Sequence, residues 1–355
     1  MADKEKLPLT IHKNIFGKLD KKDVYLFKLS NSKMDVAITN YGATIVSIEV
    51  PDKEGNKKNV VTGFDNLYQY FEEHPYFGCI VGRFANRIAF GKFSIDRIEY
   101  HLPINNGSNH LHGGINGFNK KLWKLEGIIQ QENSVGVVFV YDSIHNEEGY
   151  PGNLTATVTY SLTNNNELVI DYKASTDKST IINLTNHSYF NLTGFEEETI
   201  YNHHLKLYSS SYTVKNENNV PTGEIAVVKN TFLDFSTTKK IGKHINQFAS
   251  DKGYDHNYVL NNKSGDVVLA AELYEPQSGR LLKVFTDQPG VQVYTANWFD
   301  GSFIGSQHKP YLKHCSIALE TQAFPDAPNH TNFPNTVLRP DDLYTTKTVY
   351  QFSIS

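Results

Sequence analysis

Cysteine is scarce in this chain. Its 355 residues include only two cysteines, Cys79 and Cys315, which lie far apart and inside apolar segments. Small secreted domains held together by disulfides carry more cysteines, so a disulfide framework is excluded and a reducing compartment is expected. No cysteine has the spacing of a metal site, and no glycine-rich phosphate loop is present.

The chain also lacks a strong charge of either sign and a long hydrophobic run. The formal net charge is -4 and the basic residues form no stripe, so nucleic acid is not expected as a partner. Residues 1–6 contain no apolar signal segment, and no run approaches the roughly 20 apolar residues of a membrane span. We therefore expect a cytoplasmic protein without a membrane partner, either a monomer or a homodimer.

Aromatic and strand-forming residues are abundant instead. Hydrophobic residues make up 39% of the chain and aromatic residues 12%, with 21 tyrosines and 21 phenylalanines, which suffices for a sizeable core and favours strands. The length alone would suggest two domains, but no linker-like segment appears, and β-sandwiches can run long as one unit. We expect residues 1–355 to form a single domain.

The hydrophobic pattern has a period of two. Residues 155–162 alternate polar and apolar side chains, as do residues 34–38, which is typical of half-buried strands. Asn, Gly, Asp and Pro clusters separate such segments, and helical signals are confined to a turn or two over residues 66–71. Further strands are expected over residues 24–29, 44–50, 135–141, 167–174, 180–184, 203–207, 267–274, 281–286, 291–297, 316–321 and 346–353. The predicted fold is all-β, a large antiparallel β-sandwich with few short helices.

One stretch concentrates planar polar side chains. Residues 82–88 read Gly-Arg-Phe-Ala-Asn-Arg-Ile, and residues 105–114 read Asn-Asn-Gly-Ser-Asn-His-Leu-His-Gly-Gly. Together these groups donate and accept hydrogen bonds, as a polyhydroxylated ligand requires. With an acid/base pair elsewhere in the chain, the stretch predicts an enzyme that acts on a free sugar.

Glu320 and His187 are the candidates for that pair. Glu320 ends an apolar strand before a proline-rich loop, where partial burial would raise its pKa and suit it to accept a proton. From this segment alone, however, a surface glutamate on a strand edge is a more common case than a catalytic one. His187 titrates near neutrality and can give or take a proton, although a histidine hydrogen-bonded in a core or turn is the commoner case.

The His-x-His pair has two interpretations. His112 precedes two glycines, which let a ligand approach the backbone, and His110 would share its face of an extended strand. A metal site is the alternative, but no third ligand follows at a diagnostic spacing, so no metal is expected. The other histidines considered are expected at the surface: His12, His74, His101, His145, His203 and His204.

Hydroxyl-binding groups have structural alternatives of similar weight. Asn86 and Arg87 combine an amide with a guanidinium fork that suits oxygen-rich ligands, or the arginine pairs with a structural carboxylate. Asp255 could accept hydrogen bonds from vicinal hydroxyls or be an ordinary turn residue. Gln292 shares its strand face with Tyr294, pointing either to a ligand or outward. Trp123 and Trp298 could stack on a sugar ring, although most such rings lie in cores.

These segments together resemble the aldose 1-epimerases, that is, the galactose mutarotases. The match runs from about residue 40 to the C-terminus, through the segments 40–43, 82–88, 105–117, 186–192, 255–257, 288–297 and 319–329. Each motif is weak, whereas the set in register is specific. The turn at Asp96-Arg97 departs from the family, which usually has Asp-Gly or Asn-Gly there, so another turn type is expected.

The resemblance implies a cofactor-free interconversion of the α and β anomers of a hexose such as galactose or glucose. It assigns Glu320 to remove the proton of the C1 hydroxyl and His187 to protonate the ring oxygen, so that the ring opens and re-closes from the other face. His112 would polarise the region near the ring oxygen. The residues implied to bind the sugar are Asn86, Arg87, His112, Tyr189, Asp255 and Gln292.

Two other functions stay open. An epimerase of hexose 6-phosphates would need further Arg or Lys side chains at the pocket rim, and Arg83 could serve, although a structural role fits it equally. A carbohydrate-binding module on the same fold would not need the acid/base pair.

Overall fold

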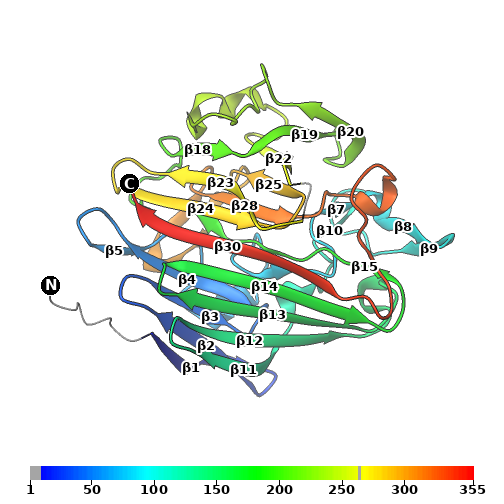
Figure 1. Ribbon diagram of the computed structural model, residues 1–355, viewed down its shortest axis with the longest axis horizontal. Coiled ribbons are helices and arrows are strands. Elements are labelled where there is room, and N and C mark those ends of the chain that lie inside the picture. Colours follow the sequence, from blue (N-terminus) through cyan, green and yellow to red (C-terminus); the bar gives the residue numbers. More distant parts are fainter. Residues whose placement is uncertain (1–8, 263–264) are drawn as a thin grey trace.

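The computed structural model of the protein describes residues 9–262 and 265–355, which form three large antiparallel sheets (Figure 1). The first sheet has the order β1 (Thr10–Leu19), β2 (Lys22–Ser30), β3 (Asp35–Thr39), β4 (Thr44–Pro51), β5 (Lys57–Asn59). The second has the order β11 (Lys124–Gln130), β12 (Ser134–Ser143), β13 (Leu154–Thr163), β14 (Glu167–Thr176), β30 (Tyr344–Ile354), β24 (Arg280–Thr286), β23 (Val268–Tyr274), β18 (His204–Leu207), β21 (Lys239–Lys240). The third has the order β17 (Tyr189–Phe190), β28 (Ile317–Gln322), β25 (Gly290–Tyr294), β22 (Asp255–Leu260), β19 (Ser209–Lys215), β20 (Pro221–Val227).

Short strand pairs and single turns of 3-10 helix complete the described structure. The pairs are β7 (Arg87–Ile88) with β10 (His110–Leu111), β6 (Ile80–Val81) with β16 (Thr185–Asn186), β8 (Lys92–Ile95) with β9 (Ile98–His101), β15 (Thr180–Ile181) with β29 (Val337–Leu338), and β26 (Asp300–Ile304) with β27 (Pro310–Leu312). The helical turns are η1 (Leu67–Tyr70), η2 (Ala89–Gly91), η3 (Phe118–Lys120), η4 (Glu147–Gly149), η5 (Ile241–Lys243), η6 (Ile245–Gln247), η7 (Ser306–His308) and η8 (Ala327–Asn329). Over residues 9–262 and 265–355, none of the helices could span a membrane.

The period-two prediction is confirmed. Along β13 and β14 buried residues alternate with more exposed ones, because one face of each strand packs on the core. Each predicted strand overlaps an observed one, although residues 180–184 contribute only the two-residue β15. The helical turn expected at residues 66–71 is η1. Among the strands of six or more residues, the prediction missed β1, β11, β19, β20 and β22.

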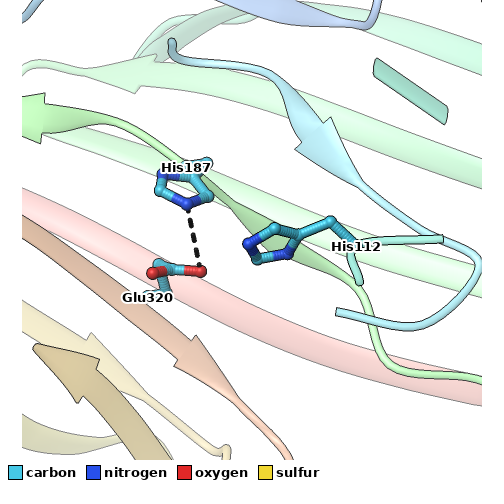
Figure 2. Close-up of side chains that lie close together, drawn as sticks. All are labelled: His112, His187 and Glu320. Atoms are coloured by element: carbon cyan, nitrogen blue, oxygen red, sulfur yellow. Dashed lines mark ion pairs between the residues drawn. The ribbon is translucent and has the colours of Figure 1, made fainter. Parts of the chain in front are cut away.

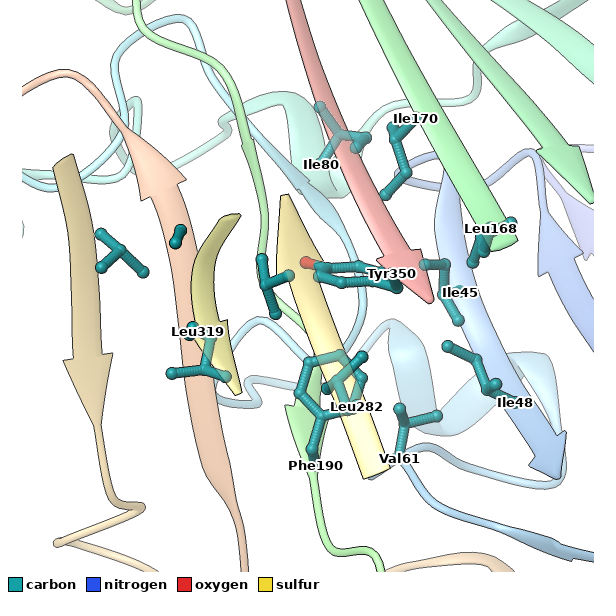
Figure 3. Close-up of a cluster of buried hydrophobic side chains, with 14 of the residues drawn as sticks. Ile45, Ile48, Val61, Ile80, Leu168, Ile170, Phe190, Leu282, Leu319 and Tyr350 are labelled. Atoms are coloured by element: carbon teal, nitrogen blue, oxygen red, sulfur yellow. The ribbon is translucent and has the colours of Figure 1, made fainter. Parts of the chain in front are cut away.

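The core lies between the nine-stranded sheet and the other two large sheets. Ile48 of β4, Leu168 of β14 and Leu319 of β28 belong to one apolar cluster, and each is at most 1% exposed. Figure 3 shows these side chains around Tyr350 of β30, which fills the space between the sheets. This shared interior supports the proposal that the chain is a single domain.

The turn at Asp96-Arg97 corrects one expectation. The two residues join β8 to β9 as a two-residue hairpin loop, with Ile95 opposite Ile98. Both have positive φ, 51° and 68°, which is the backbone of a type I′ turn. The turn type usual for Asp-Gly is therefore formed without glycine. The carboxylate of Asp96 accepts hydrogen bonds from both terminal nitrogens of the Arg339 guanidinium, each at 2.9 Å.

Candidate active site

The eight predicted site residues line one cavity of about 370 Å³. They come from chain segments more than 200 residues apart, which the sheets bring together. Residues that were not predicted also line it: Pro75, Tyr76, Asn106, Leu111, Asn219 and Tyr294. Trp298 lies at the cavity with 59% of its surface exposed, whereas Trp123 is fully buried in the core. A larger hollow of about 710 Å³ beside Arg280 is less suited to catalysis, since that guanidinium is tied to backbone carbonyl groups.

Glu320 is held by the six-stranded sheet, on the second strand from its edge. It lies on β28, directly opposite Gln292 on β25, and only 2% of it is exposed, so the surface interpretation is wrong. Burial raises the pKa of Glu320 well above its usual value, and the charge of Asp255 adds to the effect while Arg87 opposes it. A carboxyl group shifted in this direction is a stronger base when ionised.

His187 faces Glu320 across the cavity. Its Nε2 lies 3.5 Å from Oε2 of Glu320, and Figure 2 shows the two side chains pointing toward one another. The segment between β16 and β17 is fixed because His187 N–H donates to Cys79 and its carbonyl accepts from Gly78. Burial lowers the pKa of His187 to about 3, and the ring of Tyr189 stacks on it with centroids 4.8 Å apart.

His112 is locked in one tautomer. The backbone N–H of Asn86 donates to its Nδ1 at 3.1 Å, so the neutral ring carries its proton on Nε2. Burial keeps the pKa of His112 well below its usual value, so the ring stays neutral. One ring nitrogen points toward Glu320 and His187 (Figure 2), and because Nδ1 is occupied this group is an N–H donor aimed into the site.

His110 does not share the face of His112. His112 has a positive φ of 52°, so the chain leaves the extended conformation after β10 and the two rings diverge. His110 is fully buried, with Nδ1 2.7 Å from the carbonyl of Pro103 and Nε2 2.7 Å from the hydroxyl of Tyr150. The expectation of a common face was wrong, because the pattern cannot reveal a residue in the left-handed region.

The same three groups could geometrically hold a metal ion. The ligand atoms of His112, His187 and Glu320 lie within 4.8 Å of one another. The chemistry of the donors fits a metal less well, because the tautomer that Asn86 imposes leaves Nε2 of His112 without a free lone pair. The cluster is better suited to moving protons and donating a hydrogen bond.

One wall of the cavity presents groups suited to hydroxyls. Gln292 Nε2 donates to Asp255 Oδ1 at 2.5 Å, and Arg87 Nε donates to Asn106 Oδ1 at 3.1 Å. Burial opposes ionisation of Asp255, but the charges of Lys215 and Arg87 outweigh it and lower the pKa of this carboxyl. Its ionised form can accept hydrogen bonds from neighbouring hydroxyls.

Two other expectations change with the structure. Arg83 is 1% exposed and its terminal nitrogens donate to Ser143, Pro151 and Gly152, so its role is structural. His203 is fully buried rather than at the surface, and its Nε2 accepts the N–H of Leu192. A buried role is hard to predict for such residues, because their partners come from distant loops.

Comparison with known proteins identifies the family. Residues 25–351 match the family described as aldose 1-epimerase. The chain belongs to this family. Relatives named galactose mutarotase are 41% identical in pig and in human, each over 98% of this chain and 99% or more of the relative. The aldose 1-epimerase of Escherichia coli is 34% identical over 91% of this chain and 93% of its own length.

Solved structures of family members share the fold. A galactose 1-epimerase from Lactobacillus acidophilus superposes with a TM-score of 0.86 and 28% identity, covering 98% of this chain and 99% of the other. An aldose epimerase homologue from C. elegans gives 0.85 and 29%, with coverages of 93% and 98%. The predicted resemblance and the predicted all-β fold are thus both confirmed.

Proposed function

We propose that the protein is a mutarotase that interconverts the α and β anomers of free hexoses such as galactose and glucose. Family membership supports the reaction class, which is that of an isomerase. The observation that carries the assignment to this cavity is the buried pair of Glu320 and His187, 3.5 Å apart. Opening a pyranose ring requires one group to take a proton from O1 and another to give a proton to O5. Both oxygens are bonded to C1, so acid and base must be neighbours.

The proton inventory of the pair suits this reaction. Burial raises the pKa of Glu320 and lowers that of His187, so it favours the neutral carboxyl group and the neutral imidazole, which together carry one proton. The arrangement with a carboxylate and an imidazolium has the base and the acid that ring opening needs. Glu320 removes the proton from O1 while His187 protonates O5, and the C1–O5 bond breaks to give the open-chain aldehyde. Rotation about C1–C2 and the reverse transfers form the other anomer.

The surrounding residues bind and orient the sugar. His112 donates from Nε2 toward the reacting oxygens, since its Nδ1 is occupied by Asn86. Arg87, Asp255 and Gln292 bind the ring hydroxyls from the opposite wall. The proposed reaction needs no cofactor, and the proposed partner is the hexose itself, with the chain acting as a monomer or homodimer.

The alternative substrates and roles are less well supported. Arg83, which was considered for a 6-phosphate, is directed away from the cavity into backbone carbonyl groups. A pure binding module would not need two oppositely shifted titratable groups in contact, and such groups are typical of catalytic sites.

Polarimetry on freshly dissolved α-D-galactose and α-D-glucose tests the proposal, with the wild type beside Glu320→Gln. We expect rapid relaxation with the wild type and its loss in the variant, with sugar affinity retained. The kcat/KM profile should be bell-shaped, because a second proton inactivates the pair at low pH and loss of the last proton inactivates it at high pH. Full activity of Glu320→Gln would disprove the mechanism. No acceleration by the wild type would redirect the search to hexose 6-phosphates.

A further inference from the structure

A lysine that the proposed mechanism does not use lies behind the hydroxyl-binding wall. Lys215, at the end of β19, is largely buried, with 15% of its side chain exposed. Its three ammonium hydrogens have three acceptors: Asn219 Oδ1 at 2.6 Å, the backbone carbonyl of Asp255 at 2.7 Å and Asp251 Oδ2 at 3.0 Å. A lysine in this position ties the turn after β19 to the start of β22.

This contact fixes the orientation of the Asn219 amide. A lysine ammonium can only donate, so the atom that it contacts must be the amide oxygen and not the nitrogen. Nδ2 of Asn219 is left with two N–H donors and has no protein partner within residues 9–262 and 265–355. Asn219 lines the same cavity as the eight predicted site residues, which places it beside a ligand bound there.

Hydrogen bonds within the β19–β20 turn and one from a neighbouring loop hold the segment that carries Asn219. Within the turn, the side chain of Asn216 accepts the N–H groups of Asn218 and Val220. Across the cavity rim, Asn109 Nδ2 donates to the carbonyl of Asn218 at 3.1 Å. Asn219 itself has a φ of 59°, a conformation that asparagine tolerates better than most residues. A donor fixed in this way loses little entropy when it binds a hydroxyl.

We propose that Asn219 donates a hydrogen bond to one hydroxyl of the bound sugar and that Lys215 holds it in position, so that the β19–β20 turn determines substrate specificity. This inference rests on the proposed function. The hydroxyl-binding wall then offers a donor, Asn219, and an acceptor, Asp255. This combination suits a sugar hydroxyl, which can both accept and donate a hydrogen bond. Asn219 touches the substrate, whereas Lys215 is a positioning residue.

Two substitutions isolate the donor. Asn219→Asp keeps an oxygen for Lys215 and tolerates the positive φ, but it removes the N–H groups. Asn219→Gly keeps the backbone conformation and removes the side chain without adding charge. The substrates are galactose and its 2-, 3-, 4- and 6-deoxy derivatives, and exchange NMR at anomeric equilibrium gives kcat/KM without pure anomers.

We expect both variants to lower kcat/KM for galactose by about three- to tenfold, as for one neutral hydrogen bond. The loss should vanish for the one deoxy sugar that lacks the contacted hydroxyl. An unchanged rate on galactose, or an equal loss on every sugar, would overturn the proposal. If the wild type accelerates none of these sugars, the proposed function itself fails, which is a separate result.

A double-variant cycle tests the role of Lys215. In Lys215→Met the freed amide no longer points at the substrate, so adding Asn219→Gly should cost less than twofold more. Losses that simply multiply would show that Lys215 does not hold Asn219. Thermal denaturation of each variant confirms that the fold is intact.

Discussion

The cavity proposed as the active site and the layer behind it use the same residue types in opposite ways. His112 faces the cavity and keeps Nε2 free as a donor, whereas His110, two residues earlier, has a partner at each ring nitrogen. Pro103 has only a carbonyl acceptor, so Nδ1 of His110 carries the proton, and the two rings are opposite tautomers. Likewise, Arg87 lines the cavity, whereas the guanidinium of Arg83 donates its hydrogen bonds to backbone carbonyl groups.

The difference separates the residues proposed to act on the substrate from the residues that support the fold. In the cavity Oε2 of Glu320 and Nδ1 of His187 are buried without a hydrogen-bond partner within the part of the chain that the structure describes. A buried polar atom without a partner costs stability, and in a cavity the use of that atom by a ligand explains the cost. Behind the cavity some buried atoms also lack a partner among the described residues, such as Nε of Arg83 and Nδ1 of His203. Both ring nitrogens of His110 and the terminal nitrogens of Arg83 are paired there, so loss of these side chains should affect stability rather than turnover.

Substitution of one histidine from each region should give the largest difference between the regions, in kcat on one side and in stability on the other. We expect His187→Gln to lower kcat by about 10²- to 10⁴-fold, because the acid for the ring oxygen is lost. His110→Gln should leave kcat within about threefold but lower the free energy of unfolding by about 1–3 kcal/mol, since Tyr150 or Pro103 loses its partner. Polarimetry and urea denaturation measure the two quantities. A reversed outcome would break the distinction between the regions.

Substitution of the two arginines should show the same contrast between stability and activity. Arg83→Met leaves several carbonyl groups buried without a donor, so we expect a loss of about 3 kcal/mol or more in unfolding free energy. Arg87→Met should alter stability by under about 1 kcal/mol and lower kcat/KM by about 10- to 100-fold, as for hydrogen bonds to a charged group. An Arg83→Met variant of normal stability would contradict its structural role.

Acid stability should depend on buried histidines from both regions. Burial lowers the pKa of His187 and His256 to about 3 and that of His203 to about 4. In the unfolded chain each titrates near 6.5, so below that pH the unfolded state binds more protons and stability falls. Each histidine contributes about 1.4 kcal/mol per pH unit between the two pKa values, while the raised pKa of Glu320 acts in the opposite sense. Unfolding measured from pH 7 to 4.5 should show this slope.

His203→Gln is the matched variant for that measurement. Its amide oxygen can still accept the N–H of Leu192, but it takes up no proton. The slope should decrease by one proton, and an unchanged slope would show that His203 is not held neutral.

The smallest effect is expected at the hairpin tip, remote from both regions. Arg97 adopts a φ of 68°, which glycine accepts at lower cost. Arg97→Gly should raise the free energy of unfolding by about 0.5–1 kcal/mol and leave kcat unchanged. The midpoint of urea unfolding checks this, with Asp96→Ala, which removes the Arg339 contact, as a contrasting variant. A destabilised Arg97→Gly would show that its side chain does more than occupy the turn.

Strand prediction succeeded where one face of a strand is apolar and failed where both faces carry polar residues. β13 alternates along its whole length and was found, whereas β22 begins Asp-His-Asn because that end lines the cavity. β20 was missed because its exposed edge carries little pattern. The predicted site residues were gathered into one cavity, but Tyr76 and Asn219 were missed, since each lies in a loop whose position depends on distant strands.

The sequence by itself determined the all-β architecture and singled out Glu320 and His187 as the proposed acid/base pair, because side-chain alternation and the ordered set of motifs are properties of the chain alone. Only the tertiary structure decided how these groups behave. The tautomers of His110 and His112, the opposite pKa shifts of Glu320 and His187 and the orientation of Asn219 follow from partners elsewhere in the chain. Burial and hydrogen bonding act through space, and packing alone sets which atoms meet.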